Sequence, residues 1–315
     1  MISHTKSDEV AYAIDVHDLN KSFSKKKIIS NLSLRVKRGQ VFGLLGPNGS
    51  GKTTTMRLLC GLLKPDSGGG TCLGYDIEKE SLQIKQHIGY MPQNFSLYDD
   101  LTVAENLYFV ARLYGLDNQK QIVQQTILDT GLENVAHKLA GELSGGWKKR
   151  FSLAAVLMHK PKLLLLDEPT AGVDPKARRN YWHILHQLAQ KEAVTIIVST
   201  HYMDEAERCY EMAYIKNGDV LVQGTIPQII ADSKLITFNL SPCDSDELET
   251  QLSRLRIVKQ VARFGNDLHV SGFDEQALKH EIGSLVSSHQ RWEKIPTSLE
   301  DVFISLSNRQ GSGHA

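Results

Sequence analysis

A glycine-rich segment in the first fifth of the chain has the residue types and spacing needed to bind phosphate. It has the form G-x-x-x-x-G-K-[ST], in which glycines let successive backbone N–H groups surround an anion. It follows the apolar run 41–45 and precedes the helix-compatible run 54–63, so a helix dipole would point at the same anion. Lys52 would reach the β- and γ-phosphates, and the hydroxyl of Thr53 would bind Mg²⁺. The sequence therefore predicts a nucleoside triphosphate ligand, held by Gly46, Pro47, Asn48, Gly49, Ser50, Gly51, Lys52, Thr53 and Thr54.

Two adjacent carboxylates end a second apolar run. Residues 163–166 are all leucine, and Asp167 and Glu168 follow them directly. A continuous apolar run is typical of a central parallel strand, and α/β sheets bind ligands at the carboxyl ends of such strands. We expect Asp167 to hold Mg²⁺ through its water shell and Glu168 to polarise the water that attacks the γ-phosphate. Taken alone, the pair could also be a solvated acidic strand end.

Three further side chains each have a functional and a structural interpretation. His201 follows the buried run 195–200, where its imidazole could hydrogen-bond the γ-phosphate, although a lone histidine is more often structural. Gln93 ends the short predicted strand 88–92; its amide could bind Mg²⁺ or hold a water, or it could be a surface residue. Phe23 could stack on an adenine ring or cap the core at a strand end.

A second candidate anion-binding segment precedes a helix predicted at 148–158. Its sequence is Ser-Gly-Gly, which offers a hydroxyl and free backbone N–H groups at a helix start. Taken alone it could be an N-cap and nothing more. The residues concerned are Ser144, Gly145 and Gly146.

The composition narrows the class of protein. Lys and Arg together number 36, as do Asp and Glu, so no excess positive charge is available for nucleic acid, and we expect none as a main partner. The four cysteines show no C-x-x-C spacing, which indicates neither disulfides nor a zinc site. The start of the chain has no signal-peptide pattern, and no window approaches the about 18 consecutive apolar residues of a membrane span. If the protein works at a membrane, other chains would have to cross it.

Periodicity predicts the elements around these motifs. Alternating apolar residues between 14 and 36 indicate antiparallel strands. Apolar residues of 101–113 recur at helical spacing, and helical sequence continues to about residue 139. We expect the apolar face of this segment to pack in the core of the domain and not to form an interface with another protein. From residue 235 to 295 the pattern is β-α-β-β-α-β, the ferredoxin-like order, and a last helix is expected from a capping box at 297–300.

The motifs in this order resemble the nucleotide-binding domain of ABC transporters, over about residues 13–230. The resemblance rests on the phosphate loop, Gln93 after Met91-Pro92, the sequence LSGG at 143–146, Asp167-Glu168, Asp174 and His201. It implies ATP and Mg²⁺ as ligands, with Glu168 as catalytic base and His201 as its γ-phosphate partner. It also implies that Phe23 stacks on adenine, that Gln93 couples Mg²⁺ and water to a membrane partner, and that Asp174 contacts a second subunit.

The same resemblance implies a dimer, because the Lys52 loop of one chain would face Ser144 of another across each ATP. Trp147 stands where the family usually has Gln, and Val173 where Leu is commoner. We expect function to be retained, because neither change removes a group that does chemistry.

The end of the chain resembles the C-terminal extension of the drug-export branch, through the stretch LEDVF at 299–303. That branch pairs with separate membrane subunits of the ABC-2 type, which implies an ATPase peripheral to the cytoplasmic face of the inner membrane. An alternative is a soluble ABC ATPase acting on a ribosome or nucleic-acid complex, and a further one is a nucleotide-gated interaction module without turnover. The single nucleotide domain, the neutral charge, and intact Glu168 and His201 argue against these alternatives.

The expected fold class is α/β: a P-loop NTPase domain with an antiparallel β subdomain and an α-helical subdomain, then a small α+β ferredoxin-like domain. For the C-terminal domain, dimer support or regulation is our interpretation. The expected boundaries are a disordered tail at 1–12, the ATP-binding domain at 13–230 with its helical subdomain at about 94–158, the accessory domain at 231–308 and a flexible tail at 309–315.

Overall fold

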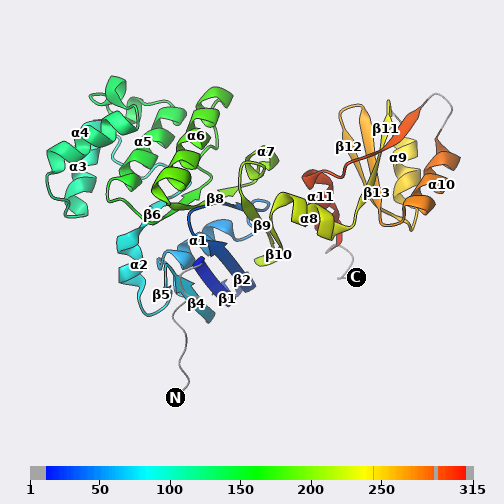
Figure 1. Cartoon of the computed structure of the whole chain (residues 1–315), viewed down its shortest axis with the longest axis horizontal. Coiled ribbons are helices and arrows are strands. Elements are labelled where there is room, and N and C mark those ends of the chain that lie inside the picture. Colours follow the sequence, from blue (N-terminus) through cyan, green and yellow to red (C-terminus); the bar gives the residue numbers. More distant parts are fainter. Residues whose placement is uncertain (1–11, 244, 287–289, 310–315) are drawn as a thin grey trace, which may run out of the picture. The chain divides into compact units, whose positions relative to one another are not determined.

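The computed structural model describes residues 12–243, 245–286 and 290–309. The chain divides into two compact units, the first ending at Val220 and the second beginning at Leu221 (Figure 1). The sequence predicted a boundary after residue 230. The division comes earlier because helix α8 (Ile226–Ser233) contacts α11 (Leu299–Arg309) and so belongs to the second unit. Each unit is described below by itself.

The two predicted tails lie almost wholly outside the described residues. Tyr12, at the inner end of the first tail, is instead the first residue of strand β1. Arg309, at the start of the second, is the last residue of α11. Among the described residues, every helix is too short or too polar to cross a bilayer.

A six-stranded sheet lies at the centre of the first unit, in the order β10-β9-β3-β8-β7-β6. The pairs from β9 to β6 are parallel, so their carboxyl ends meet at one edge of the sheet. Strands β3 and β7 are buried along their whole length, as their continuous apolar sequences predicted. The strands are β3 (Val41–Leu45), β6 (Ile88–Met91), β7 (Leu163–Asp167), β8 (Thr195–Thr200), β9 (Glu211–Lys216) and β10 (Asp219–Gly224).

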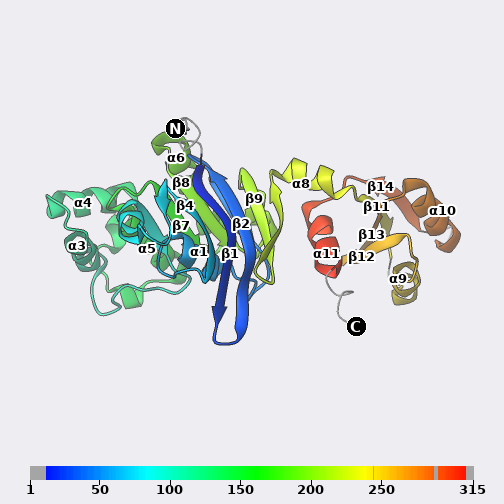
Figure 2. The same ribbon diagram turned by 90° about the horizontal axis from the view of Figure 1, so that it is seen from below.

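A separate antiparallel sheet, in the order β2-β1-β4-β5, forms the predicted β subdomain. Its long strands β1 and β2 run side by side in Figure 2. The alternation seen in the sequence is confirmed, because Ile14 pairs with Val36 and Val16 with Leu34, and all four side chains are buried. The strands are β1 (Tyr12–Phe23), β2 (Lys26–Lys37), β4 (Ser67–Cys72) and β5 (Tyr75–Asp76).

The alternate side chains of the central strands enter two different cores. Leu163 and Leu165 of β7 pack in the core that contains α1 and the antiparallel sheet. Leu164 and Leu166 pack in the core that contains α6. This double coverage explains why the strand is apolar at every position. The helices of this part of the unit are α1 (Lys52–Leu59), α2 (Ser81–His87), α6 (Pro175–Glu192) and α7 (Met203–Ala206).

The predicted helical subdomain contains three helices and two short 3₁₀ turns with a core of their own. A capping box between Thr102 and Glu105 starts α3, whose residues Val103, Leu107 and Val110 are buried, as the helical spacing predicted. Helix α5 begins three residues earlier than expected, because Ser144 is its N-cap. The elements are α3 (Val103–Leu113), α4 (Gln119–Asp129), Glu133–Val135, Ala140–Glu142 and α5 (Gly145–Leu157).

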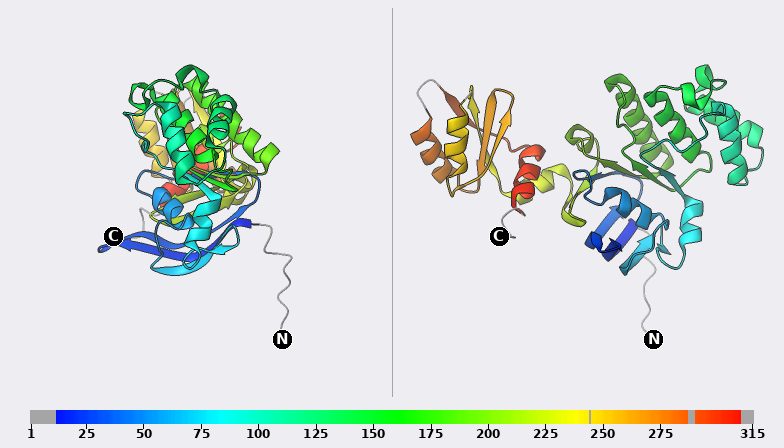
Figure 3. Two further views of the ribbon diagram at one scale, coloured as in Figure 1. Left: turned by 90° about the vertical axis from the view of Figure 1, so that its left-hand side faces the viewer. Right: turned by 180° about the vertical axis from the view of Figure 1, so that it is seen from behind.

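The second unit has the predicted β-α-β-β-α-β order. Its sheet is antiparallel in the order β12-β13-β11-β14, with α9 and α10 on one face and α11 on the other (Figure 3). An apolar core that includes Phe238 and Val270 lies within this unit. The elements between α8 and α11 are β11 (Ile236–Ser241), α9 (Asp246–Ser253), β12 (Val258–Phe264), β13 (Asp267–Gly272), α10 (Glu275–Leu285) and β14 (Arg291–Ile295).

The start of α11 differs from the sequence prediction by one residue. The capping box joins Ser298 to Asp301: each backbone N–H donates to the other's side chain, at 2.8 and 3.1 Å. Thr297 is not the cap, because its hydroxyl donates to the carbonyl of Leu235 and contacts the hydroxyl of Thr237. Tertiary contacts therefore decided which of two adjacent hydroxyl residues caps the helix.

Candidate active site

The glycine-rich loop joins β3 to α1 at the carboxyl edge of the central sheet. Gly49 and Gly51 have φ angles of 79° and 107°, in the left-handed region that favours glycine. A Cβ on Gly51 would also lie 2.7 Å from Cδ1 of Ile29 in strand β2. Both the backbone conformation and this close approach to the antiparallel sheet therefore require glycine at position 51.

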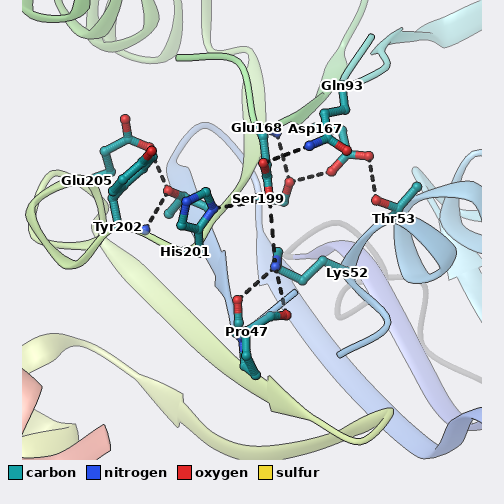
Figure 4. A network of polar contacts seen from close by, with 12 residues as sticks. Pro47, Lys52, Thr53, Gln93, Asp167, Glu168, Ser199, His201, Tyr202 and Glu205 are labelled. Atoms are coloured by element: carbon teal, nitrogen blue, oxygen red, sulfur yellow. Dashed lines mark hydrogen bonds and ion pairs between the residues drawn. The ribbon is translucent and has the colours of Figure 1, made fainter. Parts of the chain in front are cut away.

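Lys52 is the first residue of α1, directly after the loop, and only 6% of its surface is exposed. Its Nζ donates to the carbonyls of Gly46 and Pro47, at 2.7 and 3.1 Å, and lies 3.9 Å from Oε1 of Glu168 (Figure 4). Burial lowers the pKa of Lys52, while the charges of Glu168 and Asp167 oppose this change. The ammonium group thus lies between the loop carbonyls and the carboxylate end of β7.

Asp167 connects the loop side of the site to the neighbouring strand. Its Oδ2 accepts a hydrogen bond from Thr53 Oγ1 at 2.7 Å, and its Oδ1 accepts one from Ser199 Oγ at 2.5 Å. A hydroxyl and a carboxylate in direct contact are the hard oxygen ligands that Mg²⁺ uses, so Thr53 and Asp167 fit the predicted metal site. Among the described residues no group of three or more His, Cys, Asp or Glu could hold a metal by itself, so other oxygens would complete the coordination.

Glu168 is contacted by the other two predicted catalytic side chains, Gln93 and His201. Its Oε2 accepts from Gln93 Nε2 at 2.9 Å, and its Oε1 lies 3.2 Å from Nδ1 of His201 (Figure 4). These partners follow strands β6 and β8, which flank β7 in the sheet. The parallel strand order therefore brings together three residues that are far apart in the sequence.

Ser199, which no sequence motif singled out, contacts both acids from the neighbouring strand β8. Its Oγ donates to Asp167 and accepts from the backbone N–H of Glu168 at 3.0 Å. The two strands run in register, with Asp167 opposite Ser199. A polar residue near the end of the apolar run 195–200 was the available signal, but its partner depends on which strands are neighbours.

A second missed group surrounds the buried carboxylate of Glu205, which is 1% exposed. Glu205 accepts from the hydroxyls of Thr170 and Thr200, and Nε of Arg178 lies 3.6 Å from it. Thr200 also accepts from the backbone N–H of Tyr202 at 3.0 Å, beside His201. The group joins the loop after Glu168, helix α6 and the segment that carries His201.

The other predicted site residues lie outside this network within the described part of the chain. Ser144 is exposed, and its side chain makes no capping hydrogen bond at the start of α5. Gly145 and Gly146 form the first turn of that helix. Asp174 is the N-cap of α6 and accepts from two backbone N–H groups at 3.0 Å. Phe23 is 46% exposed at the end of β1. Their predicted roles involve groups outside this single chain, which are an adenine ring for Phe23 and a second subunit or its bound ATP for the others.

Comparison with known proteins gives the family. Residues 29–171 match the family described as ABC transporter. Over 302 residues the chain is 35% identical to the Nod factor export ATP-binding protein I of Burkholderia lata, covering 94% of this chain and 97% of that protein. The chain belongs to the ABC transporter family of ATP-binding proteins. The predicted ABC ATPase cassette is therefore confirmed, and the site at the carboxyl edge of the sheet is that of an ATP-binding protein.

Further similarities to known ABC proteins cover 67–70% of this chain. The chain is 43% identical over 222 residues to the probable multidrug ABC transporter ATP-binding protein YbhF of Escherichia coli, which is 70% of this chain but only 38% of YbhF. The structure of cbiO1 from Clostridium perfringens, described as part of an ABC transporter complex, has a TM-score of 0.64 and 32% identity, covering 70% of this chain and 92% of that one. The dimeric cassette MJ0796 bound to ADP and Pi has a TM-score of 0.62 and 25% identity, covering 67% and 98%. These structures confirm the predicted P-loop fold of the ABC cassette.

Proposed function

We propose that this protein is the ATP-hydrolysing subunit of an ABC exporter and that Glu168 is its catalytic base. The observation that carries this proposal is the position of the Glu168 carboxylate, which contacts Gln93 and His201 and lies 3.9 Å from Lys52. A base must be oriented by partners and lie beside the bound phosphates, and this arrangement supports both requirements.

In the proposed reaction, the loop amides and Lys52 would bind the β- and γ-phosphates, and Thr53 and Asp167 would hold a Mg²⁺ ion that offsets phosphate charge. Glu168 takes a proton from a water whose oxygen attacks the γ-phosphorus. The bond from that phosphorus to the bridging oxygen breaks, and the electron pair leaves with ADP. Gln93 and His201 orient the carboxylate, through the hydrogen bonds already formed to its two oxygens.

We further propose that the active form pairs two chains with two-fold symmetry, so that Ser144 of each chain contacts the ATP bound at Lys52 of the other. Supporting this, Ser144 begins a 13-residue helix with its hydroxyl free of any capping bond, so the helix N-terminus is available to an anion. An isologous pairing satisfies both sites at once. The dimeric structures of the related cassette MJ0796 are consistent with it. Hydrolysis would then remove the charge that both halves share and let them separate.

The proposed cargo is a drug or another hydrophobic compound, and its path would be formed by separate ABC-2-type membrane subunits at whose cytoplasmic face this protein acts. The names of two groups of relatives, multidrug transport for YbhF and Nod factor export for the Burkholderia protein, support export. We propose no narrower class of substrate, because the membrane subunits would select the transported compound.

The decisive experiment is the substitution Glu168→Gln. It keeps the hydrogen-bonding shape and removes the base, so ATP hydrolysis should fall about 10²- to 10⁴-fold. ATP binding should persist, and light scattering should show an ATP-dependent dimer, because the nucleotide is no longer consumed. Wild-type phosphate release by this variant would show that Glu168 is not the base. A variant that stays monomeric in saturating Mg-ATP would contradict the paired sites.

A further inference from the structure

Lys149 is held by the backbone of both residues that form the proposed catalytic hydrogen bond. Its Nζ donates to the carbonyl of Gln93 at 2.7 Å and to the carbonyl of Glu168 at 3.2 Å. The side chains of these same two residues are joined at 2.9 Å. One ammonium group therefore fixes the two main-chain segments whose side chains must meet for water activation.

The main chain at Glu168 needs such support. Its φ angle is 47°, in the left-handed region that residues other than glycine rarely adopt. From one side, its N–H donates to the hydroxyl and the carbonyl oxygen of Ser199, at 3.0 and 3.2 Å. From the other side, its carbonyl accepts from Lys149 and from the N–H of Ala171, at 3.2 and 3.3 Å. Of these four hydrogen bonds, only the one from Lys149 has a charged donor.

Two nearby carboxylates favour the charged form of Lys149. Burial lowers the pKa of Lys149, and the negative charges of Asp167 and Glu168 oppose this change. The neighbouring Lys148 has a different environment: its Nζ forms an ion pair with Asp99 at 2.9 Å and lies over the ring of Phe95. Consecutive residues of a helix face different directions, so the two lysines offer a matched comparison.

Lys149 lies on the same helix as the surface offered to a second chain. Helix α5 begins at N-cap Ser144, and Lys149 follows within its first two turns. An α-helix is a rigid element over this length, so a displacement of Lys149 moves Ser144 with it. The helix thus contacts its own chain's hydrolysis residues with one side chain and presents its N-terminus outward.

We propose that Lys149 is a positioning residue that holds Gln93 and Glu168 ready for hydrolysis and, through α5, links a chain's own hydrolysis site to the Ser144 surface that serves the partner chain's ATP. The proposal rests on the proposed function, since it takes Glu168 as the base. The two can fail separately: active Glu168→Gln would remove both, whereas inactive Glu168→Gln with fully active Lys149→Met would remove only this one.

The first test measures steady-state ATP hydrolysis by the full chain carrying Lys149→Met, Lys149→Arg or Lys148→Met. For Lys149→Met we expect kcat to fall about tenfold or more while KM for ATP stays within about twofold, because orientation of the base is lost and the phosphate loop is untouched. Lys149→Arg should recover most of kcat, and Lys148→Met should match wild type. A wild-type kcat for Lys149→Met, or no recovery by arginine, would overturn the positioning role.

The second test measures the link between the two sites in mixed dimers isolated with two affinity tags. Wild-type chain is paired either with Glu168→Gln or with the double variant Glu168→Gln/Lys149→Met. In both dimers the single active site has its own intact Glu168 and Lys149, and only the α5 facing it differs. We expect the second dimer to hydrolyse ATP several-fold more slowly. Equal rates in the two dimers would overturn the link.

Discussion

Within the described part of the chain, no carboxylate lies within direct hydrogen-bonding distance of the Lys52 ammonium, although this group is almost wholly buried. Its hydrogen bonds go to two loop carbonyls, and Glu168 is at 3.9 Å. Burial of a charge without a close partner is costly, and this cost lowers the pKa of Lys52. A triphosphate would provide the missing opposite charge, so the residue gains most of its stabilisation from the bound ligand.

Lys52→Ala should therefore weaken ATP binding. Loss of hydrogen bonds between an ammonium and phosphate should reduce affinity about 10- to 100-fold, from the ~1.5–3 kcal/mol of bonds to charged groups. Titration with a fluorescent ATP analogue measures the change. Lys64→Ala, which removes an exposed lysine in the turn after α1, is the control and should bind as wild type does. Unchanged affinity in Lys52→Ala would contradict the assignment of the phosphate site.

At the residue scale, the sequence predicted the site residues that stand in a recognisable local pattern. It missed those whose role depends on which elements are neighbours in the fold. Glu168, Gln93 and His201 each end an apolar run, and the parallel sheet does bring them together. Ser199 and Lys149 could not be found, because their roles depend on strand order and on the path of α5 past the sheet. Neither the register nor that packing is encoded in a local pattern.

At the scale of elements, the Glu205 group holds three segments in place around the site. Its buried carboxylate accepts from Thr170 and Thr200 and lies beside Arg178, which contributes the compensating charge. The segments it joins are the loop after β7, helix α6 and the segment after β8. The position of His201 relative to Glu168 therefore depends on a buried ionic group that does not contact the proposed reacting atoms.

Glu205→Ala should destabilise the protein, because it leaves Arg178 without its buried partner and two hydroxyls without their acceptor. We expect a loss of about 3 kcal/mol in the free energy of unfolding. Urea denaturation followed by circular dichroism measures it. Asp204→Ala removes the other, half-exposed carboxylate near Arg178 and should cost less than about 1 kcal/mol. Equal effects of the two substitutions would contradict the importance of burial.

The capping box of α11 offers a test of helix register in the second unit. Ser298→Ala removes the acceptor for the N–H of Asp301 and should lower stability by about 1 kcal/mol. The sequence instead placed the box one residue earlier, with Glu300 as its acidic partner. Glu300→Ala at this exposed position should have little effect on the urea midpoint of the second unit. A larger effect at Glu300 than at Ser298 would favour the register read from the sequence.

The elements themselves were predicted better than their ends. Alternation found β1 and β2, apolar runs found β7 and β8, and helical spacing found α3. The starts of α5 and α11 were misplaced. At α11 two hydroxyl residues lie side by side, and the contact of Thr297 with Leu235 leaves Ser298 as the cap. Helix α5 instead begins at Gly145, although glycine has a low helix propensity. Local periodicity indicates which face of an element is buried but does not fix its ends.

At the scale of the whole molecule, paired sites predict complementation between two inactive variants. Lys52→Ala and Ser144→Arg should each hydrolyse ATP poorly, since every site in either dimer carries one lesion. In a mixed dimer both lesions fall in one site, and the other site is intact. Random mixing should therefore restore up to about a quarter of wild-type activity, because about half of the pairs are mixed and each has one working site. Phosphate release from the mixture measures this, and no recovery would contradict sites shared between chains.

Strand β10 has a consequence for anyone who wishes to produce the two units separately. It is one of the two edge strands of the central sheet and runs from Asp219 to Gly224, although the compact first unit ends at Val220. A protein truncated there would lose most of β10 and leave the buried strand β9 as an open edge, ready to pair with other molecules. The shortest fragment that keeps β9 paired on both sides would end at Gly224, and a fragment that ends four residues earlier would be more prone to aggregate.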